Sequence, residues 1–238
     1  MRPALLYSGI VLTLIGLGIP AATAFQAAAA KQAPASDRHP ITGRRYAGVM
    51  GMAGAEWLVR PERETEEQPD LALDLMNIKP GMQIADIGSG VGYMTLRMAK
   101  RVGPSGKIYG VDLQQGMLDK LNANARAANI SNVETILGLP ADPKLPDGKM
   151  DIVLMVDVYH EVSQPQEMLR KLRQAMKPDG RLILLEYRAE DPAIPINPEH
   201  KMTIEQVRRE IEPEGFKLQM PVNEALPRQH LLILTKTK

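Results

Sequence analysis

One stretch of this 238-residue chain constrains its fold most strongly. In it, an apolar run ends on an acid and three spaced glycines follow. Residues 82–87 have the composition of a buried strand, and Gly88, Gly90 and Gly92 follow at alternate positions. Residues 91–102 then place apolar side chains at helical spacing. Glycine permits the sharp bend between such a strand and helix, and it lets the backbone approach a ligand near the free amides of the helix start. The stretch therefore predicts a βα unit whose turn binds a ligand.

A second acid stands at the end of the next predicted strand. Residues 107–111 are mostly apolar, and Asp112 follows them, twenty residues beyond Gly92. At this distance a carboxylate can accept hydrogen bonds from both hydroxyl groups of a ribose. The two motifs, Asp86-Ile-Gly88-Ser-Gly90-Val-Gly92 and Val111-Asp112, together resemble the cofactor site of class I S-adenosylmethionine-dependent methyltransferases. The resemblance extends from about residue 60 to the C-terminus.

This resemblance implies S-adenosyl-L-methionine as the cofactor. Asp86 would orient the glycine loop and face the methionine end of the cofactor, while Asp112 would hold the ribose and Leu113 would lie against the adenine. An acid is also expected soon after the third strand to contact the adenine, but here Asp142 comes late, so either the loop is shifted or the contact is missing. The expected cofactor-binding residues are Asp86, Gly88, Ser89, Gly90, Gly92, Tyr93, Asp112, Leu113, Asp142 and Asp157.

Strands and helices alternate along the rest of the chain. Further strands are expected at 132–137, 150–156, 181–186, 216–220 and 230–235, and helices at 114–129, 166–176 and 203–211, with a turn at 177–180. This alternation predicts an α/β fold, a Rossmann-like doubly wound sheet in three αβα layers. The resemblance adds that the sheet is mostly parallel and that its last strand runs antiparallel between the fifth and sixth.

An ionisable cluster, Asp157-Val158-Tyr159-His160-Glu161, follows the fourth predicted strand. Methyl transfer requires alignment of the reactants and, for an oxygen or nitrogen acceptor, a group that takes up a proton. His160 is the candidate base because imidazole titrates near neutral pH. Glu161 would orient His160 or contact the acceptor, and Tyr159 would form a wall of the methyl channel. In the alternative interpretation, His160 caps the next helix or forms hydrogen bonds within the core.

Composition narrows the class of partner. The net charge of +1 and the lack of a basic tract with interleaved aromatic residues argue against a nucleic-acid partner. His160, His200 and His230 share the second half of the chain with Glu161 and Glu186, so a histidine–carboxylate metal site is conceivable. These residues lack the regular spacing of metal ligands, and no metal is predicted. The expected acceptor is a small molecule or an exposed side chain.

Two other classes of function share part of this pattern. A nicotinamide-dependent oxidoreductase would also use the glycine loop and Asp112, but the sequence shows no catalytic Tyr/Lys pair for it. An exported ligand-binding protein could have the fold without catalysis.

The N-terminal residues indicate export. Arg2 precedes an uncharged run from Leu5 to Ile19, and a small-residue motif ends at Ala24, as in a secretory signal peptide. Residues 1–24 are therefore predicted to be a signal peptide, or alternatively an uncleaved membrane anchor, and the protein is expected to be periplasmic or secreted. The remaining segments are predicted to be a flexible linker at 25–45, an N-terminal lid and helix at 46–80, and the catalytic domain at 81–238.

Overall fold

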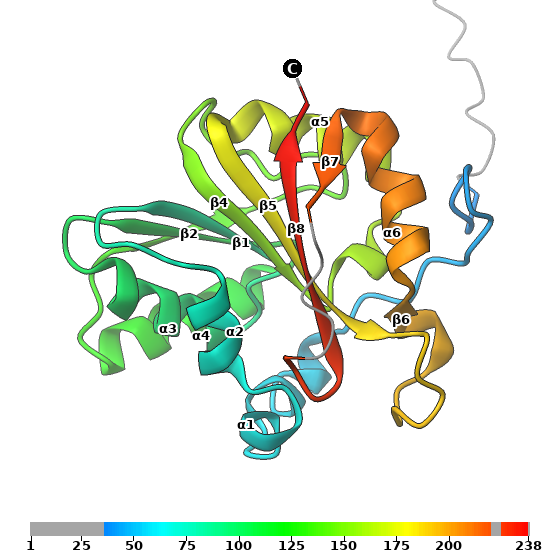
Figure 1. The fold of residues 1–238 in the computed structure, drawn as a ribbon. Helices are drawn as coiled ribbons and strands as arrows, with labels where there is room; N and C mark the ends of the chain where they lie inside the picture. Colours follow the sequence, from blue (N-terminus) through cyan, green and yellow to red (C-terminus); the bar gives the residue numbers. More distant parts are fainter. Residues whose placement is uncertain (1–35, 220–224, 238) are drawn as a thin grey trace, which may run out of the picture. The chain divides into compact units, whose positions relative to one another are not determined.

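A mixed sheet of eight strands forms the centre of the part of the chain that the structure describes (Figure 1). The structure is a computed structural model, and it describes residues 36–219 and 225–237. The strands are β1 (Gln83–Ile87), β2 (Lys107–Asp112), β3 (Val133–Leu137), β4 (Met150–Val156), β5 (Met176–Arg188), β6 (Lys201–Met202), β7 (Phe216–Leu218) and β8 (Gln229–Lys236). Their order is β3-β2-β1-β4-β5-β8-β7, with β6 paired to β5. β8 is antiparallel to β5 and β7, its two neighbours, and the other pairs are parallel, which confirms the predicted topology.

Helices cover both faces of the sheet. They are α1 (Arg63–Glu66), α2 (Pro69–Leu75), α3 (Tyr93–Val102), α4 (Gln115–Ala127), α5 (Pro165–Ala175) and α6 (Ile204–Ile211). Figure 1 shows α2, α3 and α4 on one side of the sheet and α5 and α6 on the other. Successive strand residues point to opposite faces, so Ile84 packs with α2 and α3 while Ala85 packs with α5 and α6. The three predicted layers are confirmed.

One predicted turn is instead a bulge. The sequence predicts a turn at 177–180, but β5 begins at Met176, directly after α5. β5 advances from Met176 to Arg181 while its partner β4 advances only from Met150 to Ile152, so the extra residues bulge out of the ladder. Gly180 lies against this strand, where an added Cβ would stand 2.7 Å from the Met150 carbonyl oxygen. The prediction of a turn was wrong because a bulge uses the same residue types.

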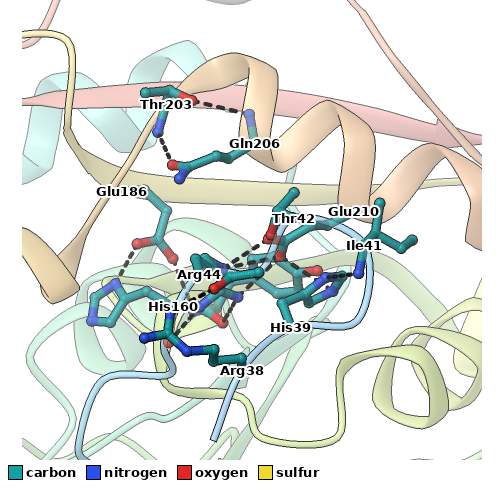
Figure 2. A network of polar contacts seen from close by, with 12 residues as sticks. Arg38, His39, Ile41, Thr42, Arg44, His160, Glu186, Thr203, Gln206 and Glu210 are labelled. Atoms are coloured by element: carbon teal, nitrogen blue, oxygen red, sulfur yellow. Dashed lines mark hydrogen bonds and ion pairs between the residues drawn. The ribbon is translucent and has the colours of Figure 1, made fainter.

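Helix α6 begins with a capping box. The Thr203 side chain accepts a hydrogen bond from Gln206 N (3.0 Å), and Gln206 Oε1 accepts one from Thr203 N (2.9 Å). This capping box fixes the start of α6 and therefore the position of Glu210 near its end (Figure 2).

The N-terminal part of the described chain packs against the domain. Residues 36–45 were predicted to belong to a flexible linker, but Arg38 and Arg45 pair as an isolated β-bridge and His39 is 1% exposed. The linker prediction is wrong for these residues because polar side chains, which carry no periodic signal, hold them in place. We call residues 36–47 the N-terminal strap. The predicted signal peptide, 1–24, and residues 25–35 lie outside the described residues.

Candidate functional site

A cavity of about 400 Å³ opens at the carboxyl ends of β1, β2 and β4. Ligands collect at this edge of an open α/β sheet, and the volume lies within the range of small-molecule pockets. The glycine loop between β1 and α3 lines it. Val49, Met50, Trp57 and Leu58 also line it, so residues of the predicted lid segment form part of its wall.

Asp112 holds the glycine loop from the end of β2. Its Oδ2 accepts a hydrogen bond from Gly90 N (2.9 Å), and its Oδ1 accepts one from Gln114 N (2.9 Å). Both are charge-assisted bonds between a carboxylate and backbone amides, and Asp112 is 8% exposed. The carboxylate therefore fixes the loop and retains lone pairs for a ligand in the cavity.

Gly88 brings the loop close to the chain that follows β4. It has a φ of +71°, and an added Cβ would lie 2.5 Å from Val158 Cγ2. Its N–H donates to the Val111 carbonyl oxygen (2.8 Å). Both conformation and space require glycine here, because a side chain would push apart the loop and the strand-end segment that carries His160.

Asp86 is buried beneath the same loop. It is 2% exposed, and its Oδ2 accepts a hydrogen bond from Thr95 Oγ1 (2.5 Å). Burial raises the pKa of Asp86 to about 7, the charge of Asp112 adds to the rise, and Thr95 and Arg63 oppose it. A cationic ligand beside Asp86 would favour its ionised form and lower this pKa.

Two buried polar atoms on the cavity wall have no hydrogen-bond partner among the described residues, namely Ser89 Oγ and Asp157 Oδ1. Asp157 directly follows β4 and adopts a φ of +53°, which is uncommon for a residue with a side chain. Its Oδ2 accepts a hydrogen bond from Gln229 Nε2 (2.7 Å). Burial raises the pKa of Asp157 well above its usual range, as do the charges of Glu67 and Glu186. Unpaired polar atoms at such a wall indicate hydrogen bonds to a ligand.

Carboxyl groups outnumber basic side chains in the lining of the cavity. Asp86, Asp112, Asp157 and Glu161 line it, and Arg63 is the only lysine or arginine among the described residues that do. Arg63 donates from Nη1 to the Leu58 carbonyl oxygen (2.6 Å) and from Nε to Glu67 Oε2 (2.7 Å), and it lies over the Tyr93 ring at 4.2 Å. This distribution suits a ligand with positive charge, which would draw the carboxyl groups with raised pKa values into their ionised form.

His160, Glu161 and His200 meet at another part of the cavity. They lie on two short 3₁₀ turns, η3 (Tyr159–Glu161) and η4 (Pro198–His200). His160 Nδ1 is 2.6 Å from Glu186 Oε2, and His160 Nε2 is 3.1 Å from His200 Nδ1. The carboxylate at Nδ1 places the proton of neutral His160 on that nitrogen and leaves Nε2 as an acceptor, which faces His200 Nδ1.

The electrostatics of this cluster follow from burial and close charges. Burial lowers the pKa of His160, but the Glu186 carboxylate, together with Asp157 and Glu161, more than offsets this effect and the pKa is raised overall. Burial raises the pKa of Glu161 to about 7, which the charge of His160 opposes. Burial lowers the pKa of His200, and the charge of His160 acts in the same direction.

The N-terminal strap contacts the backbone of this cluster. Arg44 Nη1 donates to the His160 carbonyl oxygen (2.9 Å), and Ala47 N donates to the same oxygen (3.1 Å). Figure 2 shows Arg44 and Thr42 of the strap reaching Glu210 on α6, where Arg44 Nε donates to Glu210 Oε1 (2.9 Å). Glu210 is 0% exposed. The strap therefore ties α6 to the turn that carries His160.

Most of the predicted cofactor-binding residues line the cavity, but two do not. Those that line it are Asp86, Gly88, Ser89, Gly90, Tyr93, Asp112, Leu113 and Asp157. Gly92 instead adopts a φ of +95° at the start of α3 and lies against Leu121. Asp142 closes its own tight turn with Leu139 and accepts a hydrogen bond from Lys144 N (2.8 Å), so its carboxylate is used locally.

Tyr159 does not line the cavity either. Its side chain is 0% exposed and packs in the core on the α5 and α6 side of the sheet, with Arg44 over its ring at 5.5 Å. The prediction that Tyr159 walls the methyl channel was wrong because η3 turns its ring away from the cavity. His160 and Glu161 do line the cavity, as expected.

The sequence predictions missed Arg63, which lines the cavity but lies in a charged segment that resembles a solvated helix face. His200 was named only as one of several scattered histidines, because forty residues separate it from His160 and no local motif joins the two. Tyr187 follows Glu186 at the end of β5, where side chains are expected at the ligand edge of the sheet, and it lines the cavity. Its hydroxyl donates to Glu67 Oε1 (2.8 Å).

Comparison with known proteins identifies the family. A family model described as a methyltransferase domain matches residues 78–223. The chain belongs to this methyltransferase family. The match covers the glycine loop, Asp112 and the segment after β4, and so contains the cavity described above except for its N-terminal wall.

Two curated relatives and one solved structure show how far the likeness extends. The chain is 29% identical to nocamycin O-methyltransferase of Saccharothrix syringae over 138 residues. These residues make up 58% of this chain and 47% of that protein. It is 34% identical to demethylmenaquinone methyltransferase of Symbiobacterium thermophilum over 111 residues. This alignment covers 46% of this chain and 44% of that protein. The chain thus spans about half the length of the curated relatives it matches.

A solved methyltransferase has the same fold. A SAM-dependent methyltransferase from Aquifex aeolicus aligns with a TM-score of 0.73 at 24% identity, covering 78% of this chain and 98% of that chain. The methyltransferase family indicates S-adenosyl-L-methionine as the cofactor, and this neighbour shows that the fold is shared. Among the described residues, no helix has both the length and the apolar character of a membrane span.

Proposed function

We propose that this protein transfers the methyl group of S-adenosyl-L-methionine to a small-molecule acceptor within the cavity. The supporting observation is that a single cavity joins the glycine loop and Asp112 to the cluster of His160, Glu161 and His200. The two relatives named above as acting on nocamycin and demethylmenaquinone support a small-molecule acceptor. The part-enclosed cavity favours such a molecule over the alternative acceptor, an exposed side chain.

The residues at the glycine-loop end fit the cofactor. Asp112 would accept hydrogen bonds from the ribose, and Leu113, Leu139 and Pro140 offer apolar surface to the adenine in place of the missing acid. The unpaired atoms of Ser89 and Asp157 offer hydrogen bonds to its polar groups. The four carboxyl groups suit its cationic sulfonium and ammonium groups. When bound, the cofactor supplies an electrophilic methyl group on a sulfur that leaves as a neutral thioether.

The part of the cavity around His160, Glu161 and His200 would bind the acceptor. Val162, Met168 and Ile196 provide apolar walls there. In the proposed step, the proton of an acceptor hydroxyl passes to His160 Nε2 while the hydroxyl oxygen bonds to the methyl carbon and the carbon–sulfur bond breaks. Glu186 would stabilise the imidazolium that results, because its carboxylate contacts Nδ1.

Calorimetric titration with S-adenosyl-L-methionine tests the cofactor site. Wild type is expected to bind one molecule per chain, and Asp112→Ala is expected to weaken binding about 100-fold, because two charge-assisted bonds that shape the loop are lost together with the ribose contact. The matched control is Asp119→Ala, which removes an exposed acid of α4 and should bind as wild type does.

Two results would contradict the cofactor assignment. One is unchanged affinity in Asp112→Ala, and the other is a wild-type protein that binds NAD and not S-adenosyl-L-methionine. Transfer of a labelled methyl group to any acceptor would separate an enzyme from a ligand-binding protein with the same fold.

We also propose that the protein is exported, as the N-terminal sequence predicts. If residues 1–24 are a signal peptide, mass spectrometry of the native protein should find an N-terminus at Phe25 and fractionation should recover it outside the cytoplasm. A membrane-bound protein that retains Arg2 would instead support the anchor. Recovery of the full-length chain in the cytoplasm would refute both.

A further inference from the structure

We propose that His160, His200 and Glu161 form a binding site for a first-row divalent cation in the cavity. One ligand atom from each of the three side chains can be chosen so that all lie within 4.8 Å of one another. The three residues line the cavity and come from η3 and η4, which the fold brings together from distant parts of the sequence. The sequence predicted no metal because the spacing of these residues is irregular.

Two imidazole nitrogens of the cluster lie close together. His160 Nε2 and His200 Nδ1 are 3.1 Å apart, and the ring planes meet at 79°. A cation bonded to both nitrogens at about 2.0–2.1 Å would have an N–metal–N angle of about 100°, between the octahedral and tetrahedral values. The spacing of the two nitrogens therefore suits a shared cation.

Glu186 supports the site without binding the cation. Its Oε2 lies 2.6 Å from His160 Nδ1, and its Oε1 accepts a hydrogen bond from Tyr159 N (2.8 Å). A carboxylate in contact with the distal nitrogen of a metal-binding histidine fixes the tautomer and makes the other nitrogen a stronger ligand. Glu186 is 0% exposed, so this orientation is held from within the core.

Glu161 supplies an oxygen ligand. Its Oε1 lies 4.0 Å from His200 Nδ1, and rotation of its partly exposed side chain would close the remaining distance. Two imidazole nitrogens and one carboxylate oxygen suit zinc, iron, cobalt or manganese and leave coordination positions open. Because all three residues line the cavity, an open position is available to the acceptor.

The role of the cation rests on the proposed function, whereas its binding does not. An acceptor hydroxyl bound at the open position would have a lowered pKa and would lose its proton to water before methyl transfer. The oxygen would then bond to the methyl carbon as the carbon–sulfur bond breaks. In this arrangement His160 Nε2 is a metal ligand, and the cation replaces it as the group that activates the acceptor.

Zinc binding to the purified chain tests the site. After treatment with a chelator, titration calorimetry is expected to show one Zn²⁺ per chain, and Co²⁺ is expected to give visible absorption bands from mixed nitrogen and oxygen ligands. Loss of an outer partner of a ligand typically weakens a metal site about 10–100-fold, so loss of the ligand itself in His200→Ala is expected to weaken binding by at least about 100-fold. Glu161→Gln is expected to weaken it in the same direction.

A matched control is available on η4. Glu199→Gln removes a neighbouring carboxylate outside the cluster and should leave zinc affinity unchanged. His200 is partly exposed on a surface turn, so thermal unfolding of its variant should match that of wild type. Absence of stoichiometric binding in wild type would overturn the proposal, and so would equal affinity in His200→Ala and wild type.

Titration of the same samples with S-adenosyl-L-methionine separates this inference from the proposed function. A protein that binds zinc through these residues but not the cofactor would refute the function and leave the metal site standing. Cofactor binding without zinc binding would overturn the metal site alone.

Discussion

The variant Asp86→Asn is expected to gain stability relative to wild type as the pH rises. The folded protein holds a proton on Asp86 up to a pKa of about 7, whereas an unfolded chain releases it near 3.9. Between these values the folded state binds more protons than the unfolded state, so the wild-type free energy of unfolding falls as pH rises. Asparagine carries no ionisable proton and removes this dependence.

The expected size of this effect follows from the pKa shift. The difference in free energy of unfolding between Asp86→Asn and wild type should increase by about 2–4 kcal/mol from pH 4 to pH 8, since each pKa unit corresponds to 1.36 kcal/mol. Urea denaturation followed by circular dichroism at several pH values measures it. Comparing pH values removes any constant effect of the amide itself.

The same substitution is expected to weaken cofactor binding about tenfold or more at pH 8, because a carboxylate beside a cationic ligand is lost. Asp119→Asn, at an exposed position on α4, serves as the control and should shift stability by less than about 0.5 kcal/mol at any pH. A pH-independent difference for Asp86→Asn would show that Asp86 is ionised throughout in the folded protein.

The variant Arg44→Met is expected to lose about 3–5 kcal/mol of stability, because it leaves the fully buried carboxylate of Glu210 without its main cationic partner. For a chain of this size the loss corresponds to a fall in Tm of about 10 °C. The same change removes the hydrogen bond from Arg44 to the His160 carbonyl oxygen, so zinc binding or methyl transfer should weaken as well. Thermal and urea unfolding provide the measurement.

The neighbouring arginine provides the control for this prediction. Arg45 pairs with Asp37 and Glu199 at the surface, where its side chain is 54% exposed, so Arg45→Met should cost less than about 1 kcal/mol. The double variant Arg44→Met, Glu210→Leu should recover much of the loss, because no buried charge is then left unpaired. Equal losses in the two arginine variants would mean that the strap contributes little to stability.

Local sequence patterns were enough to predict the part of the site formed by the glycine loop and Asp112. Gly88, Gly90 and Asp112 lie within a strand–turn–helix unit and at the next strand end, so chain connectivity alone places them at one edge of the sheet. The same rule placed Asp157 and His160 correctly. It failed for Asp142, whose carboxylate is used within a tight turn, and for Tyr159, whose ring packs in the core.

The sequence by itself determined the class of fold, the order of the strands apart from the two-residue β6, and the glycine loop with its two acids. These features depend on periodicity and on contacts between neighbouring elements. Only the tertiary structure brought His200 to His160 and joined the strap to α6 through Arg44 and Glu210. These contacts depend on the positions of loops whose sequences have no periodic signal. Polar side chains from distant segments can pair there only after the sheet has formed.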